Sequence, residues 1–390
     1  MKSIEKKIII SVGASHMSVH ALMLIFPSLF PVLKNQFNVG YDTLGLVVTF
    51  SSFLFGLGAI PAGWYENKFG GRQLLLLYLL GSSLSSIFIF FSNSFIQIVF
   101  GLCFLGLFSS IYHPSGLTLI SRRISNVTKG MAIHGVFGNI GLSLGPVLAA
   151  FFISAISWRF AYLFLAILNL SILIFTFFSI PYIPRNNNII TNFNINKPQN
   201  NSNILILFFM ITALLGMNYY GFTTFMPTYL AENTNKIFID ILPEVKAGIF
   251  PSLIFLSGVI GSLFGVKISI SFGKTKALLF IISMLIPILF AMAFASNYSL
   301  LVFSILWAIF FASQLPIANT LIADFTDDSK RGVGFGINFF ISFGVGSIAA
   351  YLSGLIAEKM DIYYIFIAMG LLLLPAVIFS WKIYKISQKH

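Results

Sequence analysis

Four histidines stand in the first half of a chain that otherwise carries few ionisable groups. They are His16 and His20 in "HMSVHALMLIFPSLFPVL", His113 in "GLFSSIYHPSGLTLISRR" and His134 in "KGMAIHGVFG". Imidazole changes its charge near neutral pH, so a histidine in an apolar segment can attract an anion when protonated and release it when neutral. Ionisable groups inside apolar spans are costly and mark solute or proton pathways. These residues therefore predict a solute-binding or proton-coupling site.

A metal site is the second interpretation of the same residues. His16 and His20 lie four residues apart on one face of a helix, and such a pair can chelate a metal ion. However, Asp42 and Asp324 lie near the ends of apolar runs, so no carboxylate lies deep, and Cys103 is the only cysteine. We therefore rank a metal below the proton or solute, and expect no metal, no cofactor and no catalytic residue. Imidazoles without acids also favour an anionic or neutral polar solute over a cation.

The composition is that of a membrane protein. Of the 390 residues, 57% are hydrophobic and only 9% are charged. Backbone polar groups in hydrocarbon must be bonded within the structure, so only helices or closed barrels cross a membrane. The apolar runs are long and do not alternate with polar residues, which indicates helices. The net charge of +12 comes from basic residues near the ends of these runs, so we expect a lipid bilayer and no nucleic acid as partner.

Twelve runs are long enough to cross a bilayer. The predicted spans are residues 8–33, 41–63, 73–91, 95–121, 130–155, 158–180, 203–230, 247–266, 277–296, 299–323, 331–357 and 362–382. The sequence thus predicts an all-α membrane protein with twelve transmembrane helices. The N-terminal "MKSIEKKIII" has the charge of a signal peptide, but the apolar run after it is too long, so we assign that run to the first span.

Basic residues are distributed unequally between the two sides of these spans. With the N-terminus in the cytoplasm, only five of the 23 Lys and Arg residues face outward, namely Lys34, Arg159, Lys236, Lys246 and Lys359. Cytoplasmic loops of membrane proteins are enriched in Lys and Arg. The sequence therefore predicts a multi-pass protein of a bacterial inner (plasma) membrane with both termini cytoplasmic.

An asparagine-rich segment divides the chain into two halves. "PRNNNIITNFNINKPQNNSN" predicts a cytoplasmic linker at 185–202 between six-helix bundles at 1–184 and 203–390. The halves repeat, because "HPSGLTLISRRISNVTKG" (113–130) aligns without a gap with "LPIANTLIADFTDDSKRG" (315–332), and "KFGGRQLLL" pairs with "SFGKTKALL". Parallel repeats of six spans with a site at their interface are a transporter architecture.

Two further segments have a recognisable pattern. "GWYENKFGGR" (63–72) lies between the second and third spans, and "GNIGLSLGPVLAA" (138–150) lies in the fifth. With these segments and the repeat, the chain resembles a transporter of the major facilitator superfamily over essentially its whole length. The resemblance implies two pseudo-symmetric six-helix bundles, with the first and fourth spans against a central cavity.

The loop segment resembles the family motif G-x-L-A-D-R-x-G-R-R. Four residues match this motif, Gly63, Lys68, Gly70 and Arg72, while Glu66 and Asn67 differ from it. Asn67 stands at the aspartate position, with Glu66 beside it. The resemblance implies a charge clamp that ties helix ends together in one conformation and releases them in the other.

The fifth-span segment resembles the family's antiporter motif, G-x-x-x-G-P-x-x-G-G. Gly141, Gly145 and Pro146 match it, while Ala149 and Ala150 replace the closing glycines. Small residues four apart allow another helix to approach closely, and proline bends its own helix. Ordinary small-residue packing is the other interpretation of this segment.

The first and fourth spans are similar to those of the fosmidomycin-resistance-like, drug:proton antiporter subgroup. That subgroup has H-x-x-x-D followed by two prolines, and an aromatic-His-Pro in the fourth span. The corresponding residues here are His16, His20, Pro27 and Pro31, and then Tyr112, His113 and Pro114. His20 replaces the aspartate, so the proton-coupling mechanism of that subgroup is not carried over intact.

Helix geometry places the histidines at compatible depths. With a rise of about 1.5 Å per residue, His16 and His113 lie roughly 12 Å from the cytoplasmic ends of their spans. His20 lies one turn deeper, and His134 is shallower. We favour a function for His20 and His113, with His16 in support, and a helix–helix hydrogen bond for His134. The remaining site candidates are Tyr112, Tyr219, Gln314 and Asn319.

These features predict a secondary active transporter that moves a small polar or anionic organic solute by alternating access, in proton-coupled efflux. Proton-coupled import of a nutrient such as an organic acid or sugar is the alternative with the same fold, since the antiporter motif is incomplete. A non-transporting membrane sensor or enzyme is the alternative from another class, but the chain has no soluble domain and no P-loop. One copy suffices for this fold, so we expect a monomer.

Overall fold

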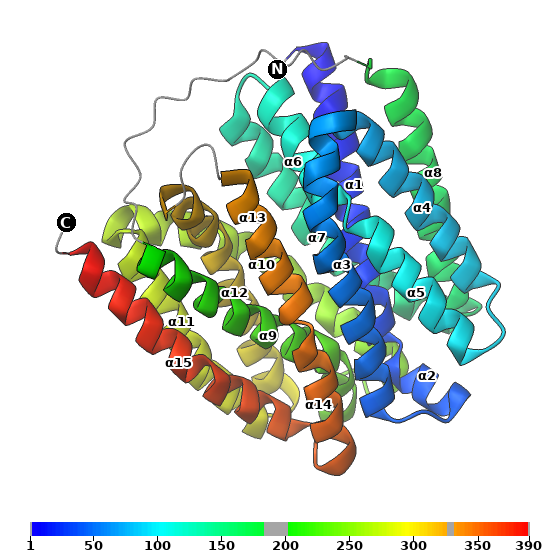
Figure 1. Ribbon diagram of the computed structural model, residues 1–390. Coiled ribbons are helices and arrows are strands. Elements are labelled where there is room, and N and C mark those ends of the chain that lie inside the picture. The colour runs from blue at the N-terminus through cyan, green and yellow to red at the C-terminus, as the bar shows by residue number, and fades with distance from the viewer. Residues whose placement is uncertain (1, 183–201, 326–330, 389–390) are drawn as a thin grey trace.

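The computed structural model describes residues 2–182, 202–325 and 331–388, and within these ranges the chain is helical with no strand. Twelve helical segments are long and apolar enough to cross a membrane (Figure 1). The predicted all-α fold with twelve spans is therefore confirmed. Because the number of spans is even, the first span begins and the last span ends on the same side of the molecule. We name this side the termini face and the opposite side the far face.

The first half of the chain contains α1 Ser3–Ser28, α2 Phe30–Phe37, α3 Tyr41–Phe69, α4 Gly71–Phe90, α5 Phe95–Ser109, α6 Tyr112–Arg123, α7 Val127–Ala155 and α8 Arg159–Ser179. The second half contains α9 Ser202–Asn233, α10 Pro243–Phe272, α11 Lys274–Phe294, α12 Asn297–Phe325, α13 Arg331–Phe339, the π-helix η1 Phe340–Val345, α14 Ile348–Lys359 and α15 Tyr363–Ser387. The predicted linker at 185–202 lies outside the described residues except for its last residue, which begins α9.

Three predicted spans are interrupted. Leu29 separates α1 from α2, and Pro31 lies in the first turn of α2. The fourth span breaks between α5 and α6, so Pro114 falls in the first turn of α6, where a missing N–H costs no intrahelical bond. The eleventh span passes from α13 through η1 into α14, and π-helical turns are frequent at functional sites. Hydropathy cannot predict these breaks, because it measures only the length of an apolar run.

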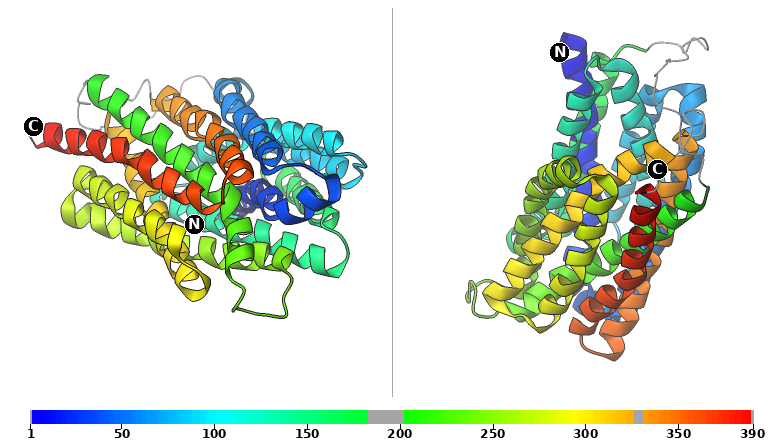
Figure 2. Two further views of the ribbon diagram at one scale, coloured as in Figure 1. Left: turned by 90° about the horizontal axis from the view of Figure 1, so that it is seen from below. Right: turned by 90° about the vertical axis from the view of Figure 1, so that its left-hand side faces the viewer.

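The helices form two bundles that correspond to the two halves of the chain (Figure 2). In the first bundle α1 packs on α7 and α8, and α4 packs on α5 and α8. In the second, α9 and α11 pack on α15, and α10 packs on α12. The bundles meet mainly where α7 packs on α10 and where α3 packs on α14 and η1. Lipid is as apolar as the helix surfaces, so close packing and hydrogen bonds must supply the attraction at this interface.

Glycines allow these joining helices to approach closely. A Cβ atom on Gly248 of α10 would lie 2.3 Å from the carbonyl oxygen of Pro146 on α7. A Cβ atom on Gly56 of α3 would lie 2.4 Å from the backbone nitrogen of Gly344 in η1. Both distances are shorter than any real Cβ contact, so the bundle interface depends on residues without side chains at these two crossings.

Hydrogen bonds across the bundle interface extend toward the far face. Thr49 Oγ1 donates to the Ser347 carbonyl at 2.7 Å, and Ser347 Oγ donates to the Thr49 carbonyl at 3.2 Å. Nearer the far face, Glu358 of α14 accepts the backbone N–H of Tyr41 at 2.9 Å and lies 3.9 Å from Lys34. A carboxylate of one bundle thus satisfies a free N–H at the start of α3 in the other.

The two halves repeat one backbone turn. Gly70 precedes α4 with φ 83° and ψ 153°, and Gly273 precedes α11 with φ 82° and ψ 150°. The two glycines occupy the same position in the aligned segments "KFGGR" and "SFGKT". Only glycine adopts this region of φ/ψ space without strain. The turn therefore explains why glycine occurs at both positions of the repeat.

Each half also has an ion pair near the termini face, and the two pairs share one aligned position. Arg122 Nη1 lies 3.0 Å from Glu66 Oε1 in the first bundle, and Lys274 Nζ lies 2.6 Å from Asp324 Oδ2 in the second. In the alignment of the two halves Arg122 corresponds to Asp324, which has the opposite charge. Each pair joins the ends of two helices of its own bundle, α3 with α6 and α11 with α12.

The repeated turn generates a prediction about stability. A Cβ atom at Gly273 has no atom within 4 Å, so Gly273→Ala changes only the backbone strain. We expect it to lower the free energy of unfolding by about 1–3 kcal/mol, measured by thermal unfolding of the purified protein in detergent. Gly63→Ala is the control, because that helical position is equally open. Equal unfolding temperatures for the two variants would contradict the prediction.

Candidate functional site

The four histidines of the first bundle come together from three helices. His16 and His20 lie on α1, His113 on α6 and His134 on α7. The ring of His16 lies 3.8 Å from that of His134 and 5.3 Å from that of His113, and the rings of His20 and His113 are 5.7 Å apart. His16, His113 and His134 are buried, and His20 is half-buried. We name these four residues the histidine cluster.

Hydrogen bonds fix the tautomer of His16. Its Nδ1 lies 2.8 Å from the carbonyl oxygen of His134, and a carbonyl can only accept, so Nδ1 carries a proton. In the neutral ring Nε2 is then an acceptor, and it lies 3.0 Å from Nε2 of His20. His20 therefore donates from Nε2, and its Nδ1 keeps a lone pair that has no partner among the described residues.

Tyr112 connects the cluster to two helices. Its hydroxyl lies 2.8 Å from the carbonyl oxygen of Val12 and 2.8 Å from Nε2 of His134. The hydroxyl must donate to the carbonyl, so it accepts from the imidazole of His134. Its ring also stacks on His16 at 5.3 Å. Tyr112 thus holds α1, α6 and α7 in register around the imidazoles.

Glycines of α7 make room for α1 and its histidines. A Cβ atom on Gly141 would lie 2.2 Å from the carbonyl oxygen of Met17, and one on Gly145 would lie 2.3 Å from that of Ala21. A Cβ atom on Gly138 would lie 2.4 Å from Cε1 of the His16 ring. The first two glycines set the distance between the helices, and the third leaves space for the imidazole itself.

Aromatic residues of the second bundle pack on His113. The ring of Phe339, at the end of α13, stacks on His113 at 4.9 Å, and that of Phe343, in η1, lies at 6.1 Å. Phe55 of α3 approaches His113 edge-on at 5.9 Å. Nε2 of His113 has no hydrogen-bond partner among the described residues. The cluster therefore lies at the bundle interface, with one imidazole nitrogen left unbonded beneath aromatic rings.

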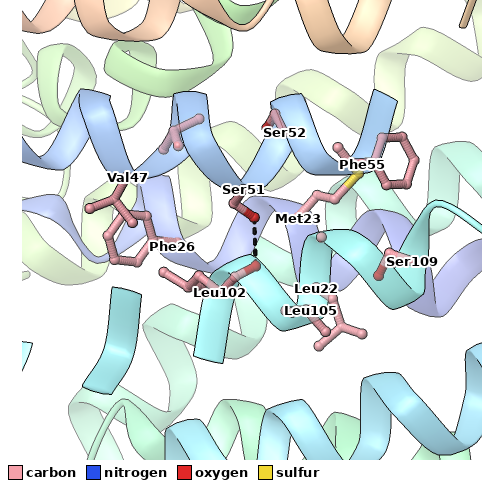
Figure 3. A pocket seen from close by; sticks show the side chains of 12 residues that line it. Leu22, Met23, Phe26, Val47, Ser51, Ser52, Phe55, Leu102, Leu105 and Ser109 are labelled. Carbon is pink, nitrogen blue, oxygen red and sulfur yellow. Dashed lines mark hydrogen bonds between the residues drawn. The ribbon is translucent and has the colours of Figure 1, made fainter. Parts of the chain in front are cut away.

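A small cavity of about 30 Å³ lies beside the cluster, between α1, α3 and α5 (Figure 3). Met23, one helical turn after His20, lines it, and so does Phe55. Ser51, which donates to the Leu102 carbonyl at 2.8 Å, also lines it, as do other apolar residues of these helices. This volume holds about one water molecule. The cavity is therefore too small for an organic solute in this conformation.

The three other candidates lie on helices of the second bundle. Tyr219 of α9 stacks on Phe311 at 5.5 Å, Gln314 of α12 is buried, and Asn319 of α12 is exposed. None of the described contacts joins them to an imidazole. They supply polarity to the second bundle, and a shared site with the histidines stays a prediction.

The loop-motif residues lie near the termini face. Arg72 donates to the carbonyl oxygens of Ile180 and Phe177, at 2.6 and 2.8 Å, and so ties α4 to the end of α8. Glu66 pairs with Arg122, as described above. Lys68 lies over the ring of Phe69, no atom lies within 4 Å of a Cβ at Gly63, and the side chain of Asn67 lies outside the described part.

The antiporter-like run also contains the pattern G-x-S-x-G of hydrolase nucleophiles at "GLSLG". In hydrolases that serine occupies a sharp turn between a strand and a helix. Here the run lies inside α7, and Ser143 Oγ donates to the carbonyl oxygen of Ser252 in the other bundle at 2.8 Å. Ser143 therefore contributes to the bundle interface.

Sequence reasoning missed several residues of this region. Gly138 stands four residues after His134 and so lies on the same face of the helix, which the sequence shows. Only the structure shows that its missing side chain leaves room for the ring of His16. Phe339 and Phe343 cannot be separated by sequence from the other phenylalanines. Glu358 was missed because its partner, Tyr41, lies in the other half of the chain.

Comparisons with known proteins find a matching family and similar proteins over most of this chain. A family model described as Major Facilitator Superfamily matches residues 12–298 and 208–389. An uncharacterized MFS-type transporter, YfnC, from Bacillus subtilis (strain 168) is 24% identical over 383 residues, which cover 94% of this chain and 90% of that protein. The fosmidomycin resistance protein of Escherichia coli (strain K12) is 21% identical over 365 residues, covering 91% and 87%. Among solved structures, a bacterial homolog of the human lysosomal transporter Spinster superposes with a TM-score of 0.80 at 13% identity, covering 99% of this chain and 98% of that one.

The packing of His16 against α7 generates a second prediction. Gly138→Ala places a methyl group against the imidazole, which cannot move without breaking its bond to the His134 carbonyl. We expect a loss of about 1–3 kcal/mol in the free energy of unfolding, as for other overpacked cores, measured by thermal unfolding. Gly135→Ala, one turn earlier on the same helix, has no atom within 4 Å and serves as the control. A Gly138→Ala variant as stable as this control would refute the described position of His16.

Proposed function

The chain belongs to the Major Facilitator Superfamily, and from this premise we propose that it exports a small polar or anionic organic solute in exchange for protons, by alternating access between its two bundles. Transport is the activity that its relatives' names and its family share. The histidine cluster is the proposed place where solute or coupling proton binds. The termini face is proposed to be cytoplasmic, in a bacterial inner membrane, because the predicted spans assign 18 of the 23 Lys and Arg residues to that side.

One observation carries the proposal: the histidine cluster of the first bundle lies directly against aromatic rings of the second. A secondary transporter needs a site whose surroundings change when its halves move. Phe339 and Phe343 pack on His113 from the other bundle. Separation of the bundles would therefore remove these rings and expose the cluster to water.

The charge of the site supports a polar or anionic solute. Among the described residues, the ionisable side chains that meet at the cluster are histidines and Tyr112, with no Asp or Glu in the group. A cationic solute would find no opposite charge there. Imidazole N–H groups donate hydrogen bonds to anions and to neutral oxygens alike.

The outward direction rests on similarity. One relative is named for resistance to fosmidomycin, and this chain matches it over 91% of its own length; for a membrane transporter, resistance is the outcome expected of export. Exchange for protons rests on the antiporter-like run, whose Gly141 and Gly145 hold α7 against the histidine-bearing helix α1. Proton-coupled import is the second candidate, because Ala149 and Ala150 replace the closing glycines of that run. Growth of a deletion strain separates them, since loss of an exporter causes sensitivity to the solute and loss of an importer causes starvation.

A transport assay tests the role of the histidines. We expect the double variant His20→Ala, His113→Ala in proteoliposomes to lose most of the solute flux that an imposed pH gradient drives in the wild-type protein. The reason is that both imidazoles with an unbonded nitrogen are removed. Tyr65→Phe, at an exposed position far along α3, is the control. Flux equal to wild type in the double variant would eliminate the cluster as the site.

A cross-link tests alternating access. Thr49 and Ser347 exchange two hydrogen bonds between the bundles, so the backbones at these positions are close enough for a disulfide. We expect Thr49→Cys, Ser347→Cys, in a Cys103→Ser background, to lose transport on oxidation and regain it on reduction. The two single-cysteine proteins are the controls. Full transport by the oxidised, cross-linked protein would show that the bundles do not separate at this crossing.

A further inference from the structure

We propose that His16, His20 and His113 form a binding site for a divalent transition-metal ion such as Zn²⁺, Co²⁺ or Ni²⁺. The site goes beyond the proposed transport activity, because it rests on the geometry of three imidazoles and not on the solute or the direction of transport. Each of the three residues offers one ring nitrogen, and these atoms all lie within 4.8 Å of one another. The sequence ranked a metal low because it offers no deep carboxylate or thiolate as a further ligand; the structure instead brings a third imidazole, that of His113, to the pair on α1.

The spacing of the first two nitrogens suits a shared metal ion. Nε2 of His16 and Nε2 of His20 are 3.0 Å apart. Two nitrogens on one tetrahedral Zn²⁺, each at about 2.0–2.1 Å, are separated by roughly 3.3 Å. A small rotation and outward movement of the half-buried His20 ring would therefore replace their mutual hydrogen bond with two bonds to a shared metal.

The proton that now joins these two rings has a place to go. Metal binding needs the lone pair of each ligating nitrogen. His16 already presents a lone pair at Nε2, while His20 holds its proton there and leaves Nδ1 unbonded. Transfer of that proton from Nε2 to Nδ1 frees the second ligand without any change in net charge.

The surroundings of His16 are those of a metal ligand. Its Nδ1–H donates to the His134 carbonyl at 2.8 Å, and ligating histidines usually donate their other ring N–H to a carbonyl or carboxylate, which orients the ring. The rings of His134 and Tyr112, which are bonded to each other, also stack on this ring, at 3.8 and 5.3 Å. The ring is thus fixed before any metal arrives.

His113 completes the site. It is buried, and its Nε2 has no hydrogen-bond partner among the described residues. A buried polar atom without a partner is costly, and a bond to a metal would satisfy it. Phe55, Phe339 and Phe343 surround this imidazole and restrict the access of water.

The donor set selects the class of ion. Three imidazoles without carboxylates favour Zn²⁺, Co²⁺, Ni²⁺ and Cu²⁺ over Mg²⁺ or Ca²⁺, which prefer oxygen ligands. Three protein ligands also leave the fourth position of a tetrahedral ion open. Because two positive charges inside the spans are costly, we expect an anion rather than water at that position.

Metal binding to the purified, full-length protein in detergent tests the proposal, with any affinity tag removed. We expect equilibrium dialysis to give one Zn²⁺ per chain, and Co²⁺ to give the visible absorption of a tetrahedral site. His16→Asn, His20→Asn and His113→Asn should each weaken Zn²⁺ binding at least about 10-fold. Loss of a residue that only hydrogen-bonds to a metal ligand already weakens binding by this factor. His390→Asn, the histidine outside the cluster, should bind as wild type.

A second measurement does not depend on the folding of variants. The X-ray absorption spectrum of Zn²⁺ bound to the wild-type protein should show imidazole nitrogens as its protein ligands, at about 2.0–2.1 Å. Absence of Zn²⁺ binding, binding equal to wild type in all three cluster variants, or a first coordination shell without imidazole would overturn the metal site. These assays contain neither solute nor gradient, so their failure would leave the transport proposal intact, and loss of flux in the transport assay would not touch the metal site.

Discussion

The close approach of α1 to α7 is the constraint on which the rest of the site depends. Gly141 and Gly145 let the backbone of α7 lie against the carbonyl groups of Met17 and Ala21. In hydrocarbon, such close packing supplies attraction that lipid exposure cannot. The same approach brings the imidazole of His16 within reach of the His134 carbonyl. A buried histidine thus obtains its hydrogen bond because two glycines, about two and three turns after His134 on α7, have no side chain.

The second bundle determines the surroundings of the cluster. A bound solute, proton or metal can favour one conformation only if it binds the two conformations with different affinity. The rings of Phe339 and Phe343 contact His113 in the described conformation. The π-helix η1 lies at this crossing, where Gly344 also meets Gly56. Movement of this one segment would therefore change both the cover of the cluster and the contact between bundles.

The sequence predicted the parts of the fold that depend on local composition. Length and hydropathy are sufficient for twelve spans, and the depth of His16 and His113 along their helices predicts that they lie at one level. The sequence could not predict which way each imidazole ring faces, because that depends on the orientation of α1, α6 and α7 about their own axes. For this reason the contact between Gly138 and His16 was invisible. The capping of α3 by Glu358 was hidden for a related reason, since it joins residues 317 positions apart.

The two ion pairs near the termini face indicate which parts of the protein move as units. Arg122 pairs with Glu66 in the first bundle, and Lys274 pairs with Asp324 in the second. Each pair joins two helix ends within its own bundle. Glu66 is buried, whereas Lys274 and Asp324 are exposed, and an exposed pair contributes little to stability, but each pair adds a link inside its bundle. The links between bundles are instead concentrated at α3 with α14 and α7 with α10. A motion that separates the bundles as rigid bodies would break only the links between bundles. It would preserve the internal geometry of the histidine cluster while the rings of Phe339 and Phe343 move away from it.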